Sequence, residues 1–311
     1  EYTYDTAGNI LSEKKNGTVT KTYKYEDSTW NDLLTEYNGT AIHYDSAGNP
    51  TEYYNGTTYY NNLTWENGRQ LTSISRPEAG INLTSRYTYD AEGIRTSKSI
   101  PITRRGLMRT HRYVTKNGKI VRESYLRITL DYIYDESGRP FALIYTNEPA
   151  EPVIYYYVLN LQGDVVKLIE ADGTVAAEYT YNAWGEILSS SGEMAVTNHL
   201  RYRGYYYDIE TGFYYLQSRY YDPATHRFIN ADGYASTDID DPIAANMFAY
   251  CGNNPIMRTD PTGTSWFSSI ISAVAVAAVA AVAVVAVVAS AGAVACVAGA
   301  VATAAGASAA T

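Results

Sequence analysis

Short runs of aromatic and β-branched residues alternate with polar residues along most of the chain. Clear examples are "KTYKY", "TEYYNGTTYYNN", "RYTYD" and "VIYYYVL". A period of two gives a strand one buried face and one wet face, and Tyr and Val suit a pleated surface. The pattern therefore predicts strands over nearly all of residues 1–260, with little helix.

Turn residues separate these runs at short intervals. The dipeptide Asn-Gly occurs at Asn16, Asn38, Asn55, Asn67 and Asn117. Asn and Gly both tolerate the positive φ angles of a tight two-residue hairpin turn. We therefore expect an all-β fold of consecutive antiparallel hairpins.

A longer motif, Tyr-Asp-x-x-Gly, recurs along the first 186 residues. It begins at Tyr4, Tyr44, Tyr89 and Tyr134, with a drifted copy at Tyr181. Its Asp can accept hydrogen bonds from backbone amides two residues on, and its Gly can adopt a left-handed turn. The motif is therefore interpreted as turn structure, and its regular spacing indicates a repeat array.

The repeats resemble tyrosine-aspartate (Rhs) repeats, and a second signature resembles the Rhs repeat-associated core domain. That signature runs from "RYRGYYYDIETGFYYLQSRYYDPATHRFINADGY" to "CGNNPIMRTDPTG". The family includes bacterial polymorphic toxins, Tc toxin C components and the shell of animal teneurins. The resemblance implies a partial shell of spiralling β-hairpins (1–186), a core domain that seals one end (187–263) and a variable tail (264–311).

Composition narrows the function further. The chain has 311 residues, 32 of them Tyr, and a formal net charge of −9. An acidic chain lacks the basic footprint that phosphate backbones need, so we expect no nucleic-acid partner. Cys251 and Cys296 lie in different surroundings, and no metal-ligand spacing is present, so no cofactor or metal is expected. The chain starts within a repeat, which suggests a fragment of a longer protein.

The resemblance also implies one catalytic site. In the bacterial family the core ends in Pro-x-x-x-x-Asp-Pro-x-Gly, and an intramolecular aspartyl protease site cuts the chain just after it. Matching residue by residue assigns the two carboxylates to Asp260 and Asp232, with Arg219 as the helper that holds one carboxylate ionised. The cut is then expected near Gly263 and Thr264. Any enzymatic activity would be this single cleavage in cis.

The assignment has rivals. Asp238 and Asp241 are alternative first carboxylates, because Asp232 is followed by Gly and Tyr rather than Pro, and the separation from Asp260 is longer than in typical members. Asp-Pro-x-Gly also fits a type I turn with no catalytic role. Both interpretations of the motif stay open at this stage.

The last part of the chain differs in composition. No charged residue follows Asp260, and residues 273–289 are Ala and Val throughout. Such a run is long enough to cross a bilayer, so we predict a membrane-associated helix over 270–302. A helix packed inside the shell cavity and a disordered Ala-rich linker are the alternatives.

Two functions follow from these expectations. The first is a secreted or cell-surface toxin component whose β-shell encapsulates its own C-terminal effector and cuts it free, with an immunity protein and a secretion apparatus as partners. The second is a non-enzymatic surface protein whose repeats bind carbohydrate or neighbouring cells, anchored by the C-terminal helix. Aromatic side chains over sugar rings would favour the second, but Tyr-rich strands also serve packing.

Overall fold

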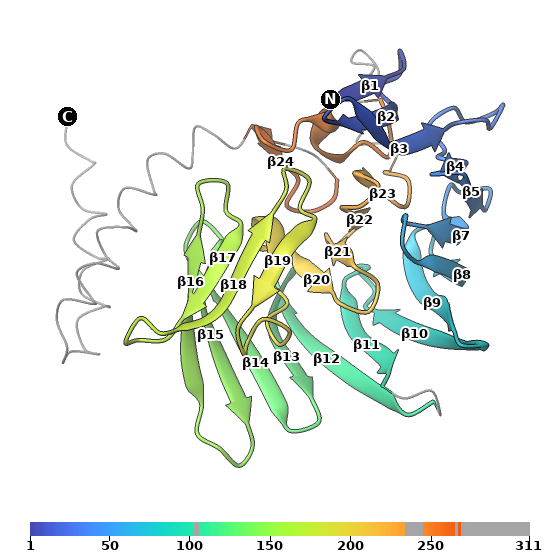
Figure 1. The fold of residues 1–311 in the computed structure, drawn as a ribbon. Helices are drawn as coiled ribbons and strands as arrows, with labels where there is room; N and C mark the ends of the chain where they lie inside the picture. The colour runs from blue at the N-terminus through green and yellow to red at the C-terminus, as the bar shows by residue number, and fades with distance from the viewer. Residues whose placement is uncertain (103–105, 234–244, 265–266, 269–311) are drawn as a thin grey trace, which may run out of the picture.

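The computed structural model describes residues 1–102, 106–233, 245–264 and 267–268, and this part of the chain is built almost entirely of antiparallel strands (Figure 1). The first sheet contains β1 (Tyr2–Tyr4), β2 (Ile10–Lys15), β3 (Thr18–Lys24), β4 (Glu36–Tyr37) and β5 (Thr40–Ala41). The second sheet contains β6 (His43–Tyr44), β7 (Pro50–Tyr54), β8 (Tyr59–Glu66), β9 (Gln70–Glu78), β10 (Ile81–Tyr89), β11 (Arg95–Pro101), β12 (Met108–Lys116), β13 (Lys119–Tyr125), β14 (Ile128–Tyr134), β15 (Pro140–Asn147), β16 (Val153–Leu159), β17 (Val165–Ile169), β18 (Val175–Tyr181) and β19 (Ile187–Ser191). We call these two sheets the wall.

The rest of the described chain forms smaller elements. One sheet contains β20 (Tyr206–Asp208), β21 (Phe213–Tyr215), β22 (Tyr220–Asp222) and β23 (Arg227–Phe228), and another pairs β24 (Arg258–Thr259) with β25 (Phe267–Ser268). Two short 3-10 helices are η1 (Tyr202–Gly204) and η3 (Tyr250–Asn253). We call residues 194–233 and 245–264 the core segment. No α-helix occurs among the described residues, in agreement with the predicted all-β class.

Strands in each sheet follow sequence order, so consecutive strands within each wall sheet pair as antiparallel neighbours, and only the β5–β6 connection passes from one wall sheet to the other. Four of the five Asn-Gly sites have positive φ at both residues, as at Asn117 (51°) and Gly118 (75°). The turn at Asn55 differs from the expectation. Its Gly56 has a positive φ of 95°, whereas the Asn55 side chain accepts hydrogen bonds from the amides of Thr57 and Thr58. Asn55 therefore acts as a side-chain cap, because its carboxamide replaces a backbone acceptor.

The repeat motif has the turn role predicted for it. Asp5 Oδ1 accepts the amides of Ala7 (2.9 Å) and Asn9 (2.8 Å), and Gly8 has a φ of 79°. The same pattern recurs at Asp45, Asp90 and Asn182, and at Asn160, a copy that was not predicted from the sequence. The missed copy has Asn in place of Asp, but the amide oxygen makes the same bonds.

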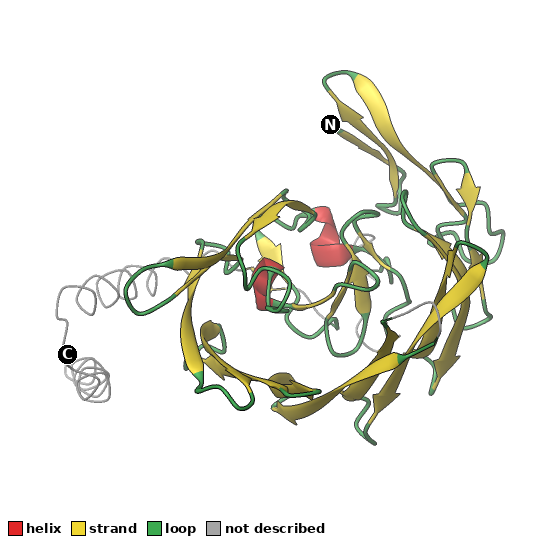
Figure 2. Cartoon of the chain, turned by 60° about the horizontal axis from the view of Figure 1, so that its bottom comes forward, coloured by secondary structure: helices red, strands yellow, loops and turns green. Residues whose placement is uncertain are grey.

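The wall curves, and the core segment lies on its concave side (Figure 2). The Tyr-rich strands β20–β23 are buried there, with Tyr214 and Tyr221 fully inaccessible. Tyr221 stacks on Tyr250 with 4.0 Å between ring centroids. These rings join wall and core segment in common apolar clusters. The aromatic-dense stretch therefore serves packing, because contacts between aromatic rings stabilise the fold beyond the contribution of the area that the rings bury.

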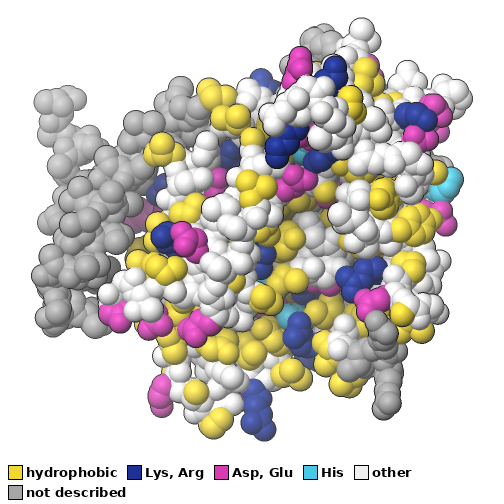
Figure 3. Space-filling model, in the orientation of Figure 1, with side chains coloured by type: hydrophobic (Ala, Val, Ile, Leu, Met, Phe, Trp, Pro, Cys, Tyr) yellow, Lys and Arg dark blue, Asp and Glu magenta, His cyan; other side chains and the backbone are white. Residues whose placement is uncertain are grey.

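The predicted domain boundaries remain predictions, although β19 lies beyond the expected end of the repeats at residue 186 and pairs with β18 in the wall. The predicted helical tail lies outside the described residues from 269 onward. Within the described residues, no helix has the length and apolarity to span a bilayer. On the face shown in Figure 3, acidic and basic side chains are interspersed rather than gathered by sign.

Candidate active site

The site begins at the turn of residues 260–263, where the chain leaves the core segment. Asp260 is buried, and its Oδ1 accepts the amides of Gly263 (2.9 Å) and Thr264 (3.2 Å). Gly263 has a φ of 74°, and a Cβ on it would lie 2.7 Å from the backbone oxygen of Leu216. The Asp260 side chain therefore caps a tight bend of the chain. We call it the exit turn.

Arg219 joins the exit turn to the second predicted carboxylate. Its Nη2 lies 3.2 Å from Asp260 Oδ2 and 2.9 Å from Asp232 Oδ2. The two carboxylate oxygens are therefore no farther apart than the sum of those distances. The three residues assigned from the family motif meet at one buried point, although they come from separate parts of the core segment.

The same guanidinium also holds backbone. Arg219 Nε donates to the carbonyl oxygen of Gly263, and Nη1 donates to that of Met247 at 3.0 Å. The peptide bond between Gly263 and Thr264 is thus held on both sides, since its oxygen contacts Arg219 and its N–H contacts Asp260. This bond lies within the region where cleavage was expected, near Gly263 and Thr264.

Burial sets the electrostatics of this point. Loss of water lowers the pKa of the Arg219 guanidinium, and the carboxylates of Asp232 and Asp260 act in the opposite direction. The Phe228 ring covers the guanidinium, with Cζ 3.5 Å from the ring centroid. A cation held beside two carboxylates in a site with little water exerts a stronger field than it would at the surface.

Three further residues support the site and were not predicted. Tyr205 Oη accepts the Asp260 amide at 3.1 Å, and Ser218 Oγ donates to Thr262 O at 2.8 Å. Arg69, from the turn between β8 and β9, lies 3.9 Å from Asp232 Oδ1. Ser218 could have been suspected as the neighbour of Arg219, whereas nothing in the sequence links Arg69 to a residue so far along the chain.

The rival carboxylates, Asp238 and Asp241, lie outside the described residues. They are therefore not compared with Asp232 in position. No group of three or more His, Cys, Asp or Glu side chains with the geometry of a metal site occurs in the described part of the chain.

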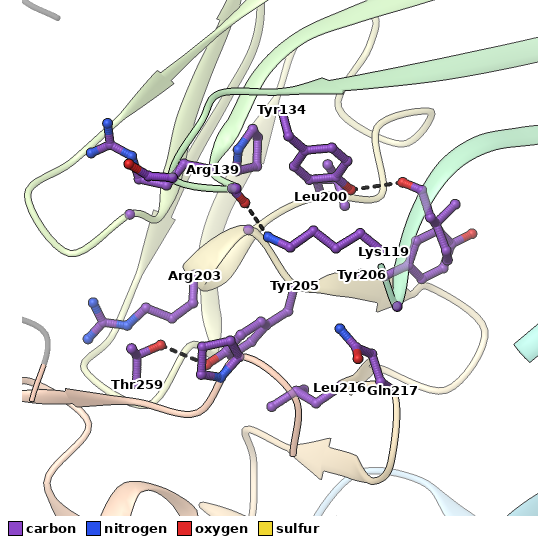
Figure 4. A pocket seen from close by; sticks show the side chains of 18 of the residues that line it. Lys119, Tyr134, Arg139, Leu200, Arg203, Tyr205, Tyr206, Leu216, Gln217 and Thr259 are labelled. Carbon is purple, nitrogen blue, oxygen red and sulfur yellow. Dashed lines mark hydrogen bonds between the residues drawn. The ribbon is translucent and has the colours of Figure 1, made fainter. Parts of the chain in front are cut away.

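A cavity of about 370 Å³ lies beside the exit turn, between wall turns and the core segment. Pro261 and Thr259 are among the residues that line it, and Lys119 lies below Tyr134 in the view of Figure 4. The Lys119 amine donates to Gly138 O, and burial lowers its pKa. The residues that line this cavity include no carboxylate and no His.

A second buried ionic cluster joins wall and core segment elsewhere. Arg95 on β11 makes two hydrogen bonds to the carboxylate of Asp208 (2.6 and 3.0 Å), and Lys98 adds a third at 2.9 Å. In another group, His111 and His199 both contact the buried carboxylate of Glu123. These histidines are far apart in sequence and meet where the core segment, which contains His199, packs on the wall strands that contain His111 and Glu123.

Several known proteins are similar to this chain. The family described as Teneurin YD-shell matches residues 1–256. The tRNA nuclease WapA of Bacillus subtilis is 32% identical over 278 residues, covering 88% of this chain and 11% of that protein. Double-stranded DNA deaminase toxin A of Burkholderia cenocepacia is 24% identical over 293 residues, covering 85% of this chain and 19% of that one.

Solved structures show the same fold. The TcdB2-TccC3-TEV structure superposes with a TM-score of 0.63 at 19% identity, covering 84% of this chain and 13% of that one. The TcdB2-TccC3-Cdc42 structure gives a TM-score of 0.59 with 84% and 15% coverage. The chain thus spans a tenth to a fifth of the length of these relatives. Together with the Tyr-Asp repeats of the wall and the enclosed core segment, these matches show that the chain belongs to the YD-shell family of Rhs repeat proteins.

Proposed function

We propose that this chain forms part of the shell of an Rhs-type toxin, encloses its own C-terminal effector and cuts the chain once in cis at Gly263–Thr264. The observation that carries the proposal is the position of Arg219, which contacts both carboxylates and the carbonyl oxygen of Gly263. An ordinary turn needs the Asp260 cap but does not need a second carboxylate beside it.

The chemistry follows from these contacts. A water molecule adds to the Gly263 carbonyl carbon while Asp232 accepts one of its protons. Negative charge grows on the Gly263 oxygen, where Arg219 Nε donates. Asp260, protonated in the reactive state, passes its proton to the Thr264 nitrogen as the C–N bond breaks. The products are a carboxyl group on Gly263 and an amino group on Thr264.

The names of the similar proteins support a toxin as the context of this reaction. One is named a deaminase toxin and another a tRNA nuclease, and this chain covers only a small share of either. We therefore propose a secreted or cell-surface bacterial protein, in which the residues after 263 belong to the enclosed cargo. An immunity protein and a secretion apparatus are proposed as its partners.

Self-cleavage can be tested by expressing the full chain and its Asp260→Asn and Asp232→Asn variants. Gel electrophoresis should show a released fragment only for the unmodified chain, and mass spectrometry should place its first residue at Thr264. Asn keeps the oxygen that caps the exit turn but cannot supply the same acid and base. Asp90→Asn is the matched control, because Asp90 caps a wall turn through the amides of Glu92 and Ile94.

The outcomes separate the assignments. Cleavage that continues unchanged in Asp260→Asn would refute the protease and leave only the turn. Loss of cleavage in Asp238→Asn or Asp241→Asn, with Asp232→Asn still active, would keep the mechanism but replace the first carboxylate. An intact unmodified chain would refute self-cleavage altogether.

A further inference from the structure

Arg69 reaches the candidate active site from the wall rather than from the core segment. It follows the Asn67-Gly68 turn that joins β8 to β9, where both residues have positive φ. The carbonyl oxygen of Gly68 accepts a hydrogen bond from Asn49 Nδ2 at 2.7 Å. Asn49 is itself buried and also donates to Asp45 of the neighbouring repeat motif. The position of Arg69 is therefore fixed by a repeat motif of the wall.

The contact with Asp232 complements that of Arg219. Arg69 Nη1 lies 3.9 Å from Asp232 Oδ1, while Arg219 Nη2 lies 2.9 Å from Oδ2. Each carboxylate oxygen thus faces a different guanidinium. Arg219 also contacts Asp260 and the carbonyl oxygen of Gly263. It therefore cannot move to hold Asp232 Oδ1 as well without giving up those contacts.

Two details show that the arginine is fitted to this place. Nη1 of Arg69 is buried and has no hydrogen-bond partner within the described residues. The Asp232 carboxylate, 3.9 Å away, therefore offsets the cost of burying this part of the cation. A Cβ on Gly233, the residue after Asp232, would lie 3.1 Å from Nη1 and 3.3 Å from Nη2. The missing side chain at Gly233 leaves the space that the guanidinium occupies.

We propose that Arg69 is a positioning residue for self-cleavage, contributed by the wall, so that the active site is complete only when the β8–β9 hairpin has packed against the core segment. The inference rests on the proposed function. Arg69 orients the Asp232 carboxylate toward the exit turn by holding its Oδ1, while Arg219 holds its Oδ2. Cleavage is thereby coupled to folding. A chain in which the β8–β9 hairpin has not yet packed against the core segment lacks Arg69, one of the two cations beside Asp232.

The test is a time course of cleavage during cell-free synthesis of the full chain, read as the cut fraction on gels. Arg69→Gln should slow cleavage by about tenfold, and Arg69→Lys should restore most of the rate, because it returns a cation to the same place. Arg122→Gln is the matched control, because Arg122 is another wall arginine paired with an Asp, Asp131, but far from the site in the wall order. It should cut at the rate of the unmodified chain.

A further variant guards against misfolding. Gly233→Ala keeps Arg69 and its charge but pushes the guanidinium away from Asp232, and it should slow cleavage by a smaller factor. Equal rates for Arg69→Gln and the unmodified chain would overturn the inference while leaving self-cleavage intact. Equal slowing in Arg69→Gln, Arg69→Lys and Arg122→Gln would also overturn it, because wall stability would then be the cause. If the unmodified chain does not cut at all, the proposed function fails first.

Discussion

Two buried arginines of this protein, Arg95 and Arg219, both contact carboxylates but differ in their other partners. Arg95 and Lys98 contact Asp208 in a cluster of wall and core side chains with essentially no exposed surface. Arg219 contacts two carboxylates but also the Gly263 and Met247 carbonyl oxygens. The first arrangement satisfies charges between side chains, whereas the second directs charge onto a peptide bond. Arg219 thus combines two carboxylates with the carbonyl oxygen of Gly263, a combination that the Arg95 cluster lacks.

The largest expected effect is on the Arg95 cluster. Asp208→Asn leaves Arg95 and Lys98 buried without their carboxylate, and removing one partner of a buried ion pair costs about 3–5 kcal/mol. Denaturant unfolding of the uncut chain should report that loss. Asp232→Asn, which leaves Arg219 paired with Asp260, should cost clearly less. Equal losses would show that the two arginines have the same role.

Asp222 is a buried carboxylate with no ion pair among the described residues, so its effect on stability should depend on pH in a different way from that of Asp208. It accepts hydrogen bonds from Tyr53, Ala224 and Thr225, and burial raises its pKa to about 7. A carboxyl whose pKa is raised from 3.8 adds stability below about pH 3.8, and that contribution is lost as the pH rises through about 7. Asp222→Asn should therefore gain stability relative to the unmodified chain between pH 4 and pH 8, by on the order of a few kcal/mol.

Asp208 provides the contrast for that measurement. Burial opposes its ionisation, but Arg95 and Lys98 hold its pKa below the ordinary value. A lowered pKa gives stability that is present above the unfolded value and is lost only at more acidic pH. The deficit of Asp208→Asn should therefore stay constant from pH 5 to pH 8. A deficit that changes over this range in step with that of Asp222→Asn would contradict the assignment of the charges.

A smaller effect is expected at the exit turn. Gly263→Ala forces a side chain into a left-handed position and brings Cβ within 2.7 Å of Leu216 O and 2.8 Å of Ser218 Oγ. Strain of this kind costs about 1–3 kcal/mol, and cleavage should slow because the peptide bond moves from Arg219. Gly17→Ala is the control, with a φ of 80° but no atom within 4 Å of the added Cβ. It should lose less stability and cut normally.

The smallest effect is expected at an exposed pair. Arg122 contacts Asp131 across β13 and β14, with 54% of the arginine side chain exposed. Exposed ion pairs contribute about 0.2–1 kcal/mol, because water and salt screen them. Arg122→Gln should lower the free energy of unfolding by no more than that. A loss as large as that of Asp208→Asn would show that exposure does not separate the two kinds of pair.

Some parts of the candidate site could be predicted and others could not. Asp260, Asp232 and Arg219 were assigned from the family motif, and the structure brings all three together. Arg69 was missed, because its turn resembles other wall turns and its contact depends on how far the wall curves. The buried pairing of His111 and His199 with Glu123 was missed for the same reason, since no spacing in sequence relates them.

The hairpins could be predicted from local sequence alone. Alternation sets strand faces, Asn-Gly sets the turns at Asn16 or Asn117, and Asp5 caps its own loop, so each of these features depends on atoms a few residues apart. Which buried charges meet, by contrast, depends on how the wall and the core segment pack in the folded chain. The contacts of Arg95 with Asp208 and of Arg69 with Asp232 join residues more than a hundred positions apart. The curvature that brings them together is summed over many strands, and no local pattern encodes that sum.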